Sequence, residues 1–134
     1  MGADTMTDRL EDVPVLIVDD DRDVRESFEA AMLAEGAEVE SCDNGNDAVE
    51  ICRSDDPPAL VVLDMMLPGR SGFLALEKIK GRAESPVVIM VTANEGKRHQ
   101  EYAEALGVDA YLIKPVPLSA LIEIAAELMA KRRG

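Results

Sequence analysis

The stretch that decides the fold is LVVLDMMLPGRSG, residues 60–72. It opens with two valines flanked by leucines, which is typical of a strand buried on both faces in a parallel sheet. The apolar run ends at a carboxylate, Asp64, and the turn-forming residues Pro68, Gly69 and Gly72 follow it. In open α/β sheets, ligands bind at the carboxyl ends of the strands. Asp64 is therefore either a simple strand end or part of a site, and the rest of the chain decides between the two.

Outward from this stretch, strand-like and helix-like segments alternate along the chain. Short apolar runs predict strands, and apolar residues spaced three or four apart predict helices between them. The alternation occurs five times, and right-handed crossovers between such units give a parallel sheet with helices on both faces. We therefore predict a doubly wound α/β fold of five parallel strands and five helices, whose strand order the pattern alone leaves open. The predicted strands are 14–18, 37–42, 60–63, 86–91 and 108–113.

Length and composition predict a single domain. The chain has 134 residues and is 47% hydrophobic and 31% charged, as expected for a globular protein with a full core. We place the domain at residues 13–134 and treat residues 1–12, which are polar and acidic without periodicity, as a flexible leader. No apolar run approaches the length of a membrane span and no signal peptide opens the sequence, so we expect a soluble cytoplasmic protein. The net charge of −13 argues against direct binding to nucleic acid or to an anionic membrane.

The cysteines and the histidine carry little functional signal. Cys42 and Cys52 have neither a CxxC nor a metal-site spacing, so we expect free thiols rather than a disulfide. His99 is the only histidine, and we expect it to be an ordinary surface residue on an exposed helix.

Polar side chains follow four of the predicted strands. Asp19 and Asp20 follow the first strand, Asp64 the third, Thr92 the fourth and Lys114 the fifth. Because parallel strands present their carboxyl ends at one edge, we expect these five residues to converge in one crevice. Three carboxylates at close range repel one another unless a cation lies among them, and hard oxygen ligands suit Mg²⁺. An aspartate in such a site can also attack phosphorus and form an aspartyl phosphate.

Four short motifs resemble those of the receiver domains of two-component response regulators. They are VDDD at 18–21, LDMMLPG at 63–69, VTA at 91–93 and IKP at 113–115. Each motif is common by itself, but all four stand at strand ends in the order and spacing of that family, over about residues 13–129. The resemblance implies the flavodoxin-like strand order 2-1-3-4-5, with a crevice between the first and third strands.

The resemblance also implies roles for the acidic residues. Asp64 would accept a phosphoryl group from the phosphohistidine of a sensor histidine kinase or of a phosphotransfer domain in a phosphorelay. Asp19, Asp20 and Asp64, with the backbone carbonyl of Met66, would bind Mg²⁺ or Mn²⁺.

Three further residues correspond to the family's phosphoryl ligands and switch. Thr92 and Lys114 would each bind a phosphoryl oxygen, and the bond from Lys114 to Pro115 is cis in the family. Tyr111 matches an aromatic residue whose rotamer changes together with Thr92. Read without the resemblance, Tyr111 is a packed core ring and Lys114 an exposed loop cation.

The resemblance implies a signalling module that catalyses only its own phosphorylation and dephosphorylation. Kinase docking would involve residues 22–25 and the loop 115–117, and output would involve the surface of the fourth helix, fifth strand and fifth helix. We expect an unknown downstream output protein or domain, and a monomer or weak dimer. The alternative is an enzyme, a Mg²⁺-dependent phosphohydrolase that works through the same aspartyl phosphate. Its usual Asp-x-Asp-x-Thr arrangement after the first strand is incomplete, because Asp23 stands where the threonine would be.

Overall fold

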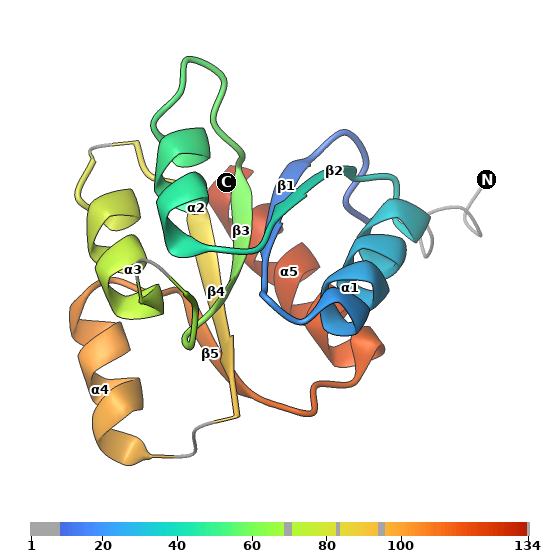
Figure 1. Ribbon diagram of the computed structural model, residues 1–134. Coiled ribbons are helices and arrows are strands. Elements are labelled where there is room, and N and C mark those ends of the chain that lie inside the picture. The colour runs from blue at the N-terminus through green and yellow to red at the C-terminus, as the bar shows by residue number, and fades with distance from the viewer. Residues whose placement is uncertain (1–8, 69–70, 83, 94–95, 134) are drawn as a thin grey trace.

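The computed structural model describes residues 9–68, 71–82, 84–93 and 96–133. It confirms the predicted alternation of strands and helices (Figure 1). None of the described helices is long and apolar enough to cross a membrane. The elements are β1 (Pro14–Val18), α1 (Arg22–Ala34), β2 (Glu38–Cys42), α2 (Gly45–Cys52), β3 (Leu60–Asp64), α3 (Gly72–Lys80), β4 (Val87–Thr92), α4 (Lys97–Ala105), β5 (Ala110–Ile113) and α5 (Leu118–Arg133).

The five strands form one parallel sheet in the order β2-β1-β3-β4-β5, which confirms the order implied by the resemblance. The chain runs from β2 at one edge past β1 to β3, so the direction of winding reverses between β1 and β3. In open α/β sheets the crevice at such a reversal, outside the carboxyl ends of the strands, is where ligands bind. The register pairs Val18 with Leu63 and Asp64 with Val91, which brings the ends of β1, β3 and β4 level.

Each face of the sheet carries its own apolar core. Side chains alternate along a strand, so Val15 and Ile17 belong to one core while Leu16 and Val18 belong to the other. Figure 1 shows α1 and α5 on one face and α2, α3 and α4 on the other. All five residues of β3 are buried, as its apolar sequence predicts. The helices contribute Phe28, Met32, Leu121, Ile122, Ala125 and Met129 to the first core, and Ala48, Val49, Cys52, Ala75, Leu76, Ile79 and Ala103 to the second.

Local capping explains where the first two helices begin. The Asp21 carboxylate accepts hydrogen bonds from the backbone of Asp23 and Val24 at the start of α1. At the start of α2 either Asp43 or Asn44 could have capped the helix, and the structure selects Asn44, whose side chain accepts from the backbone of Asp47. Cys42 and Cys52 are free thiols, as predicted.

Residues 9–12 differ from the sequence-based expectation of a flexible leader. The Leu10 side chain is 0% exposed and lies in the core beneath α1 and α5. Its backbone N–H donates to the carbonyl of Glu35, and the Arg9 guanidinium pairs with the Glu35 carboxylate at 3.4 Å. These four residues pack with the domain because one leucine has a large apolar surface to bury, a signal too short to detect by periodicity. Residues 1–8 of the predicted leader lie outside the described residues.

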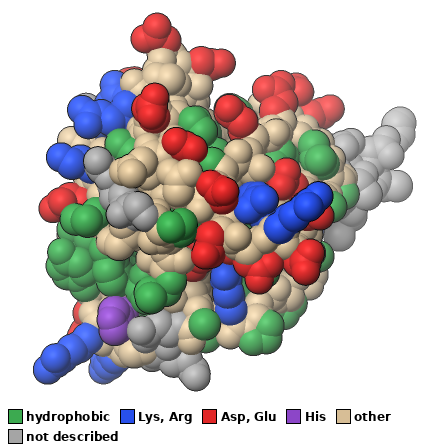
Figure 2. All heavy atoms as spheres, in the orientation of Figure 1, with side chains coloured by type: hydrophobic (Ala, Val, Ile, Leu, Met, Phe, Trp, Pro, Cys, Tyr) green, Lys and Arg blue, Asp and Glu red, His purple; other side chains and the backbone are tan. Residues whose placement is uncertain are grey.

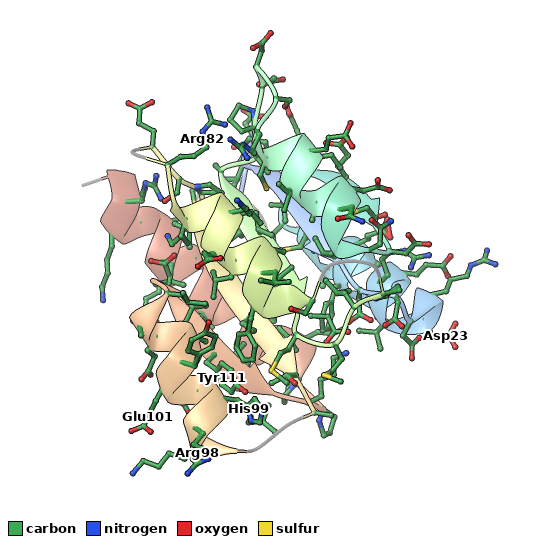
Figure 3. The ribbon with its side chains drawn as sticks, turned by 60° about the vertical axis from the view of Figure 1, so that its left-hand side comes forward. Asp23, Arg82, Arg98, His99, Glu101 and Tyr111 are labelled. Atoms are coloured by element: carbon green, nitrogen blue, oxygen red, sulfur yellow. The ribbon has the colours of Figure 1, made fainter. Side chains whose placement is uncertain are left out.

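His99 also differs from its prediction as an ordinary surface residue. It is half-buried at the start of α4 (Figure 3). Its ring stacks on Phe73 of α3 with 5.9 Å between centroids and 3° between planes. Phe73 also meets Tyr102 of α4 edge-on, with 5.0 Å between centroids. In Figure 2 a hydrophobic patch lies beside this histidine, over the α3 side of the molecule. The contact joins helices that are separate in sequence, so no local pattern predicts it.

Candidate functional site

The carboxyl edge of the sheet brings the predicted charged residues together. Oxygen atoms of Asp19, Asp20 and Asp64 all lie within 4.8 Å of one another. The Lys114 ammonium lies 2.9 Å from Oδ2 of Asp19 and 3.8 Å from Oδ2 of Asp64. Its side chain is only 22% exposed, so Lys114 belongs to this cluster and is not an exposed loop cation. Thr92 ends β4 at the same edge with a side chain that is 0% exposed.

Hydrogen bonds hold both the backbone and the side chain of Asp19. Its backbone N–H donates to the carbonyl of Cys42 in β2, and its Oδ1 accepts from the backbone N–H of Asp21 at 2.9 Å. Its Oδ2 accepts from Lys114, and its backbone carbonyl accepts from Nη1 of Arg25 at 2.8 Å. Asp19 is 2% exposed, so each of these bonds satisfies a polar group that water does not reach. Asp20, in contrast, is exposed.

Asp64 is a buried acid with an unfavourable environment for its charge. It is 6% exposed, and its Oδ1 accepts one hydrogen bond from the backbone N–H of Met66 at 3.3 Å. Loss of solvent on burial, together with the negative charge of Asp19, raises its pKa from 3.8 to about 6, although Lys114 and the hydrogen bond from Met66 oppose the rise. One ammonium is therefore not enough to neutralise this group of carboxylates.

The donor set fits a divalent cation. Carboxylate oxygens are hard ligands, and Mg²⁺ in proteins is held by one or two carboxylates together with water and phosphate oxygens. The cluster offers two buried carboxylates and one that is open to solvent, and the pKa of Asp64 is raised by burial and by the nearby charge of Asp19. A cation at this position would lower that pKa by stabilising the ionised form.

The switch residues of the resemblance also lie near this edge. Tyr111 is half-buried, and its hydroxyl lies 4.0 Å from Sδ of Met65, the residue that follows Asp64. The backbone N–H of Lys114 donates to the carbonyl of Thr92 at 2.8 Å, which ties the end of β5 to the end of β4. The bond between Lys114 and Pro115 is cis, as the resemblance implies. Tyr111 also packs against one of the two cores, so its position is compatible with both interpretations made from the sequence.

Gly72 lies directly beneath the backbone that carries Asp64. A Cβ added at this position would lie 2.5 Å from the carbonyl oxygen of Asp64 and 2.5 Å from Cα of Met65. The Gly72 N–H also donates to the carbonyl of Met65 at 2.8 Å, closing the loop that joins β3 to α3. Only glycine allows so close an approach of two backbone segments.

We expect Gly72→Ala to damage both the fold and the site. The clash is with backbone atoms, which cannot move aside as a flexible side chain can, so we expect a loss of roughly 1–3 kcal/mol in the free energy of unfolding. We also expect weaker Mg²⁺ binding, because Asp64 and Met66 move with the loop. Urea unfolding and calorimetric metal titration measure the two effects. Gly81→Ala, at the other end of α3 where φ is −72° and the nearest contact is 3.0 Å, is the control and should change metal binding little. Normal metal binding by Gly72→Ala would contradict the prediction.

Arg25 also contributes to the acidic site, a role that the sequence analysis did not predict. The resemblance places it on a kinase-docking surface, whereas in the structure its guanidinium holds the backbone of Asp19. Every residue type has a backbone carbonyl, so no particular side chain at position 19 is needed to pair with Arg25 and the sequence gives no sign of the contact. The only indication is that an arginine stands in the helix that follows the acidic turn, close enough for its side chain to reach back to that turn.

Comparisons with known proteins agree with the geometry. The family model described as the response regulator receiver domain matches residues 15–126. A receiver domain protein described as CheY-like from Methanospirillum hungatei is 28% identical, with a TM-score of 0.86 and coverage of 92% of this chain and 98% of that one. The signal receiver domain of a LuxO repressor protein from Vibrio parahaemolyticus is 27% identical, with a TM-score of 0.74 and coverage of 91% and 98%.

A third structure, the chemotaxis response regulator CheY4 of Vibrio cholerae, shares the fold. It is 20% identical, with a TM-score of 0.80 and coverage of 87% of this chain and 98% of that one. The family model spans β1 to the middle of α5 and includes all of the acidic cluster, Thr92 and Lys114. The chain therefore belongs to the family of response regulator receiver domains.

Proposed function

We propose that this receiver domain accepts a phosphoryl group on Asp64 from the phosphohistidine of a sensor histidine kinase or phosphotransfer domain. The observation that carries the proposal is the convergence of Asp19, Asp20, Asp64 and Lys114 within a few ångströms at the edge where the winding of the sheet reverses. Such an edge is the usual ligand site of an open α/β sheet. Receiver domains act in two-component signalling, and this cluster has the composition that a phosphoacceptor site needs.

The transfer is an in-line displacement at phosphorus. A carboxylate oxygen of Asp64 forms the new O–P bond as the P–N bond to the donor histidine breaks. The imidazole leaves with the electron pair of that bond and takes a proton from solvent. The attacking oxygen must be ionised, and because the pKa of Asp64 is about 6 the carboxylate is largely deprotonated at neutral pH. The Lys114 ammonium, 3.8 Å from Asp64, is within reach of an oxygen on the transferred group.

The cation of the site would be Mg²⁺ or Mn²⁺. Asp19, Asp20 and Asp64 would hold it, with the backbone carbonyl of Met66 as a further ligand. When bound, it would supply positive charge that stabilises the negative charge spread over the oxygens of the phosphoryl group during transfer. The hydrogen bonds to Asp19 from Asp21, Lys114 and Arg25 keep that carboxylate and its backbone in place.

Phosphorylation would change a second surface through Thr92 and Tyr111. The Thr92 hydroxyl would bind a phosphoryl oxygen, and because Thr92 is buried at the end of β4, its movement would affect the start of α4. Tyr111, beside Met65, would change its rotamer with Thr92 and alter the surface of α4, β5 and α5. This is a shift between two existing conformations, biased by the phosphoryl group.

The kinase or phosphotransfer domain would dock beside the acidic cluster. A largely apolar hollow lies between α1 and the segment that leads from β5 into α5. It reaches Lys114 and Ala93, so a partner helix placed there would bring its phosphohistidine close to Asp64. We expect this docking to take place in the cytoplasm. The phosphorylated domain would then act on a separate output protein or domain. The residues that line the hollow on the helix side are Asp23, Val24, Ser27 and Phe28.

Labelling with an acyl phosphate tests the proposed function. With Mg²⁺ present, we expect the protein to take up one phosphoryl group per chain, measured by intact mass, and to lose it slowly by hydrolysis. Chelation of the metal should prevent the uptake, because the Lys114 ammonium alone does not neutralise the three carboxylates. Rapid, sustained turnover of small phosphate esters far beyond one equivalent would instead favour the phosphohydrolase. No uptake from acyl phosphate or from phosphohistidine donors would overturn the proposal.

A further inference from the structure

The Arg25 side chain points back along α1 toward the acidic cluster. Arg25 is the fourth residue of α1, and its Nη1 donates to the carbonyl oxygen of Asp19, six residues earlier, at 2.8 Å. Side chains on a helix lean toward its N-terminus, so an arginine at this position can reach past the first turn. The bond therefore follows directly from where the arginine stands in the helix.

A positive charge at position 25 does not stabilise α1. The positive end of the helix dipole disfavours cations in the first turns. Among the described residues, no carboxylate oxygen lies within 4.0 Å of the Arg25 guanidinium to compensate. Arg22, one turn earlier, differs: its side chain is 78% exposed and pairs with Glu26 at 3.0 Å. The Arg25 guanidinium instead donates to the backbone carbonyl of Asp19.

The bond fixes the peptide unit that carries both acids of the first loop. The carbonyl of Asp19 belongs to the peptide bond that joins Asp19 to Asp20. β1 ends at Val18, so this carbonyl lies beyond the ladder of the sheet. With the carbonyl held by Arg25, rotation of the peptide plane is restrained, and so is the position of the exposed Asp20 relative to the buried Asp19.

We propose that Arg25 is a positioning residue that holds the peptide between Asp19 and Asp20 in the geometry that binds the divalent cation. This inference rests on the proposed function, because it concerns the cation of the same site. It adds a role to a residue that the family resemblance places on the partner-docking surface.

Two possible roles of Arg25 predict opposite effects on metal affinity. If Arg25 acted only through its positive charge, it would repel a nearby cation, and its removal would tighten Mg²⁺ binding. If it positions the two acids, its removal loosens the peptide and weakens Mg²⁺ binding. The sign of the change therefore separates the two roles.

Calorimetric titration of the isolated chain with Mg²⁺, without any partner, is the test. For Arg25→Ala we expect a dissociation constant roughly three- to tenfold higher, which is the size of the net contribution of one typical intramolecular hydrogen bond. Arg25→Lys keeps the charge and a donor and should recover part of the affinity. Amide hydrogen exchange of Asp20 and Asp21 in metal-free protein should be faster in Arg25→Ala, a readout that does not depend on the metal.

Arg22→Ala is the matched control. It removes the same charge from the same helix but breaks only the exposed pair with Glu26, so we expect unchanged or slightly tighter Mg²⁺ binding. Should Arg25→Ala fail to fold, Arg25→Met keeps the aliphatic stem without the donor and is interpreted in the same way. Unchanged or tighter binding by the Arg25 variant would overturn the proposal. Absence of Mg²⁺ binding by the unaltered protein would instead contradict the proposed function itself.

Discussion

Asp64→Asn will take up no phosphoryl group from an acyl phosphate with Mg²⁺ under conditions in which the unaltered protein is fully labelled. The reacting group is a carboxylate oxygen, and an amide oxygen at neutral pH is too weak a nucleophile to replace it. The substitution keeps the size of the side chain and its ability to accept from the N–H of Met66, so the surrounding loop should keep its shape. Intact-mass spectrometry measures the uptake directly.

The matched control for this experiment is Asp56→Asn. Asp56 is an exposed acid in the segment that leads into the amino end of β3, whereas the acidic cluster lies at the carboxyl ends of the strands. We expect this variant to be labelled like the unaltered protein. Uptake by Asp64→Asn at an unchanged rate would show that another residue is the phosphoacceptor, even if the chain still acts as a receiver.

The same Asp64→Asn variant will be more stable than the unaltered protein at neutral pH without metal. Burial raises the pKa of Asp64 from 3.8 to about 6, so the folded protein binds more protons than the unfolded chain between these values. Stability therefore falls as pH rises through this window, and the full penalty is present above it. The size of the shift predicts a gain of about 1–3 kcal/mol for the uncharged asparagine.

Urea unfolding at about pH 7.5 and about pH 3.5, both with chelator, checks the sign of this prediction. The difference between the two proteins should be full at the higher pH and small at the lower pH, where Asp64 is protonated in the folded state and mostly protonated in the unfolded state. Saturating Mg²⁺ should stabilise the unaltered protein by mass action and reduce the difference. Asp56→Asn should behave like the unaltered protein throughout. A variant that is less stable at neutral pH would contradict the electrostatic account.

Most of the fold could be predicted because short segments of the sequence are enough to identify the strands and helices. Buried parallel strands are continuous apolar runs, and LVVL before Asp64 is one of them. The polar residues at the strand ends could be predicted for the same reason. The strand order could not be derived from the pattern, because it depends on which way each crossover turns, and only the family resemblance implied it.

The features that were missed depend on contacts without a local pattern. Leu10 contributes one apolar side chain to the core, and no periodicity surrounds it. The stack of Phe73 on His99 joins two helices across 26 positions of sequence, counted from 73 to 99. Arg25 lies close to Asp19 in the chain, yet it binds a backbone carbonyl, which every residue type provides.

The stack of Phe73 on His99 also provides a natural spectroscopic reporter. Because the chain has a single histidine, the ring proton signals of His99 can be assigned in a one-dimensional NMR spectrum without isotope labelling or substitution. Its ring contacts the start of α3, which follows Asp64, from the start of α4, which follows Thr92. The ring current of Phe73 makes the chemical shift of those protons sensitive to small changes in the spacing of the two helices. Conformational exchange at this signalling domain can therefore be followed at one resonance, in the native sequence, as a cation or a phosphoryl analogue is added.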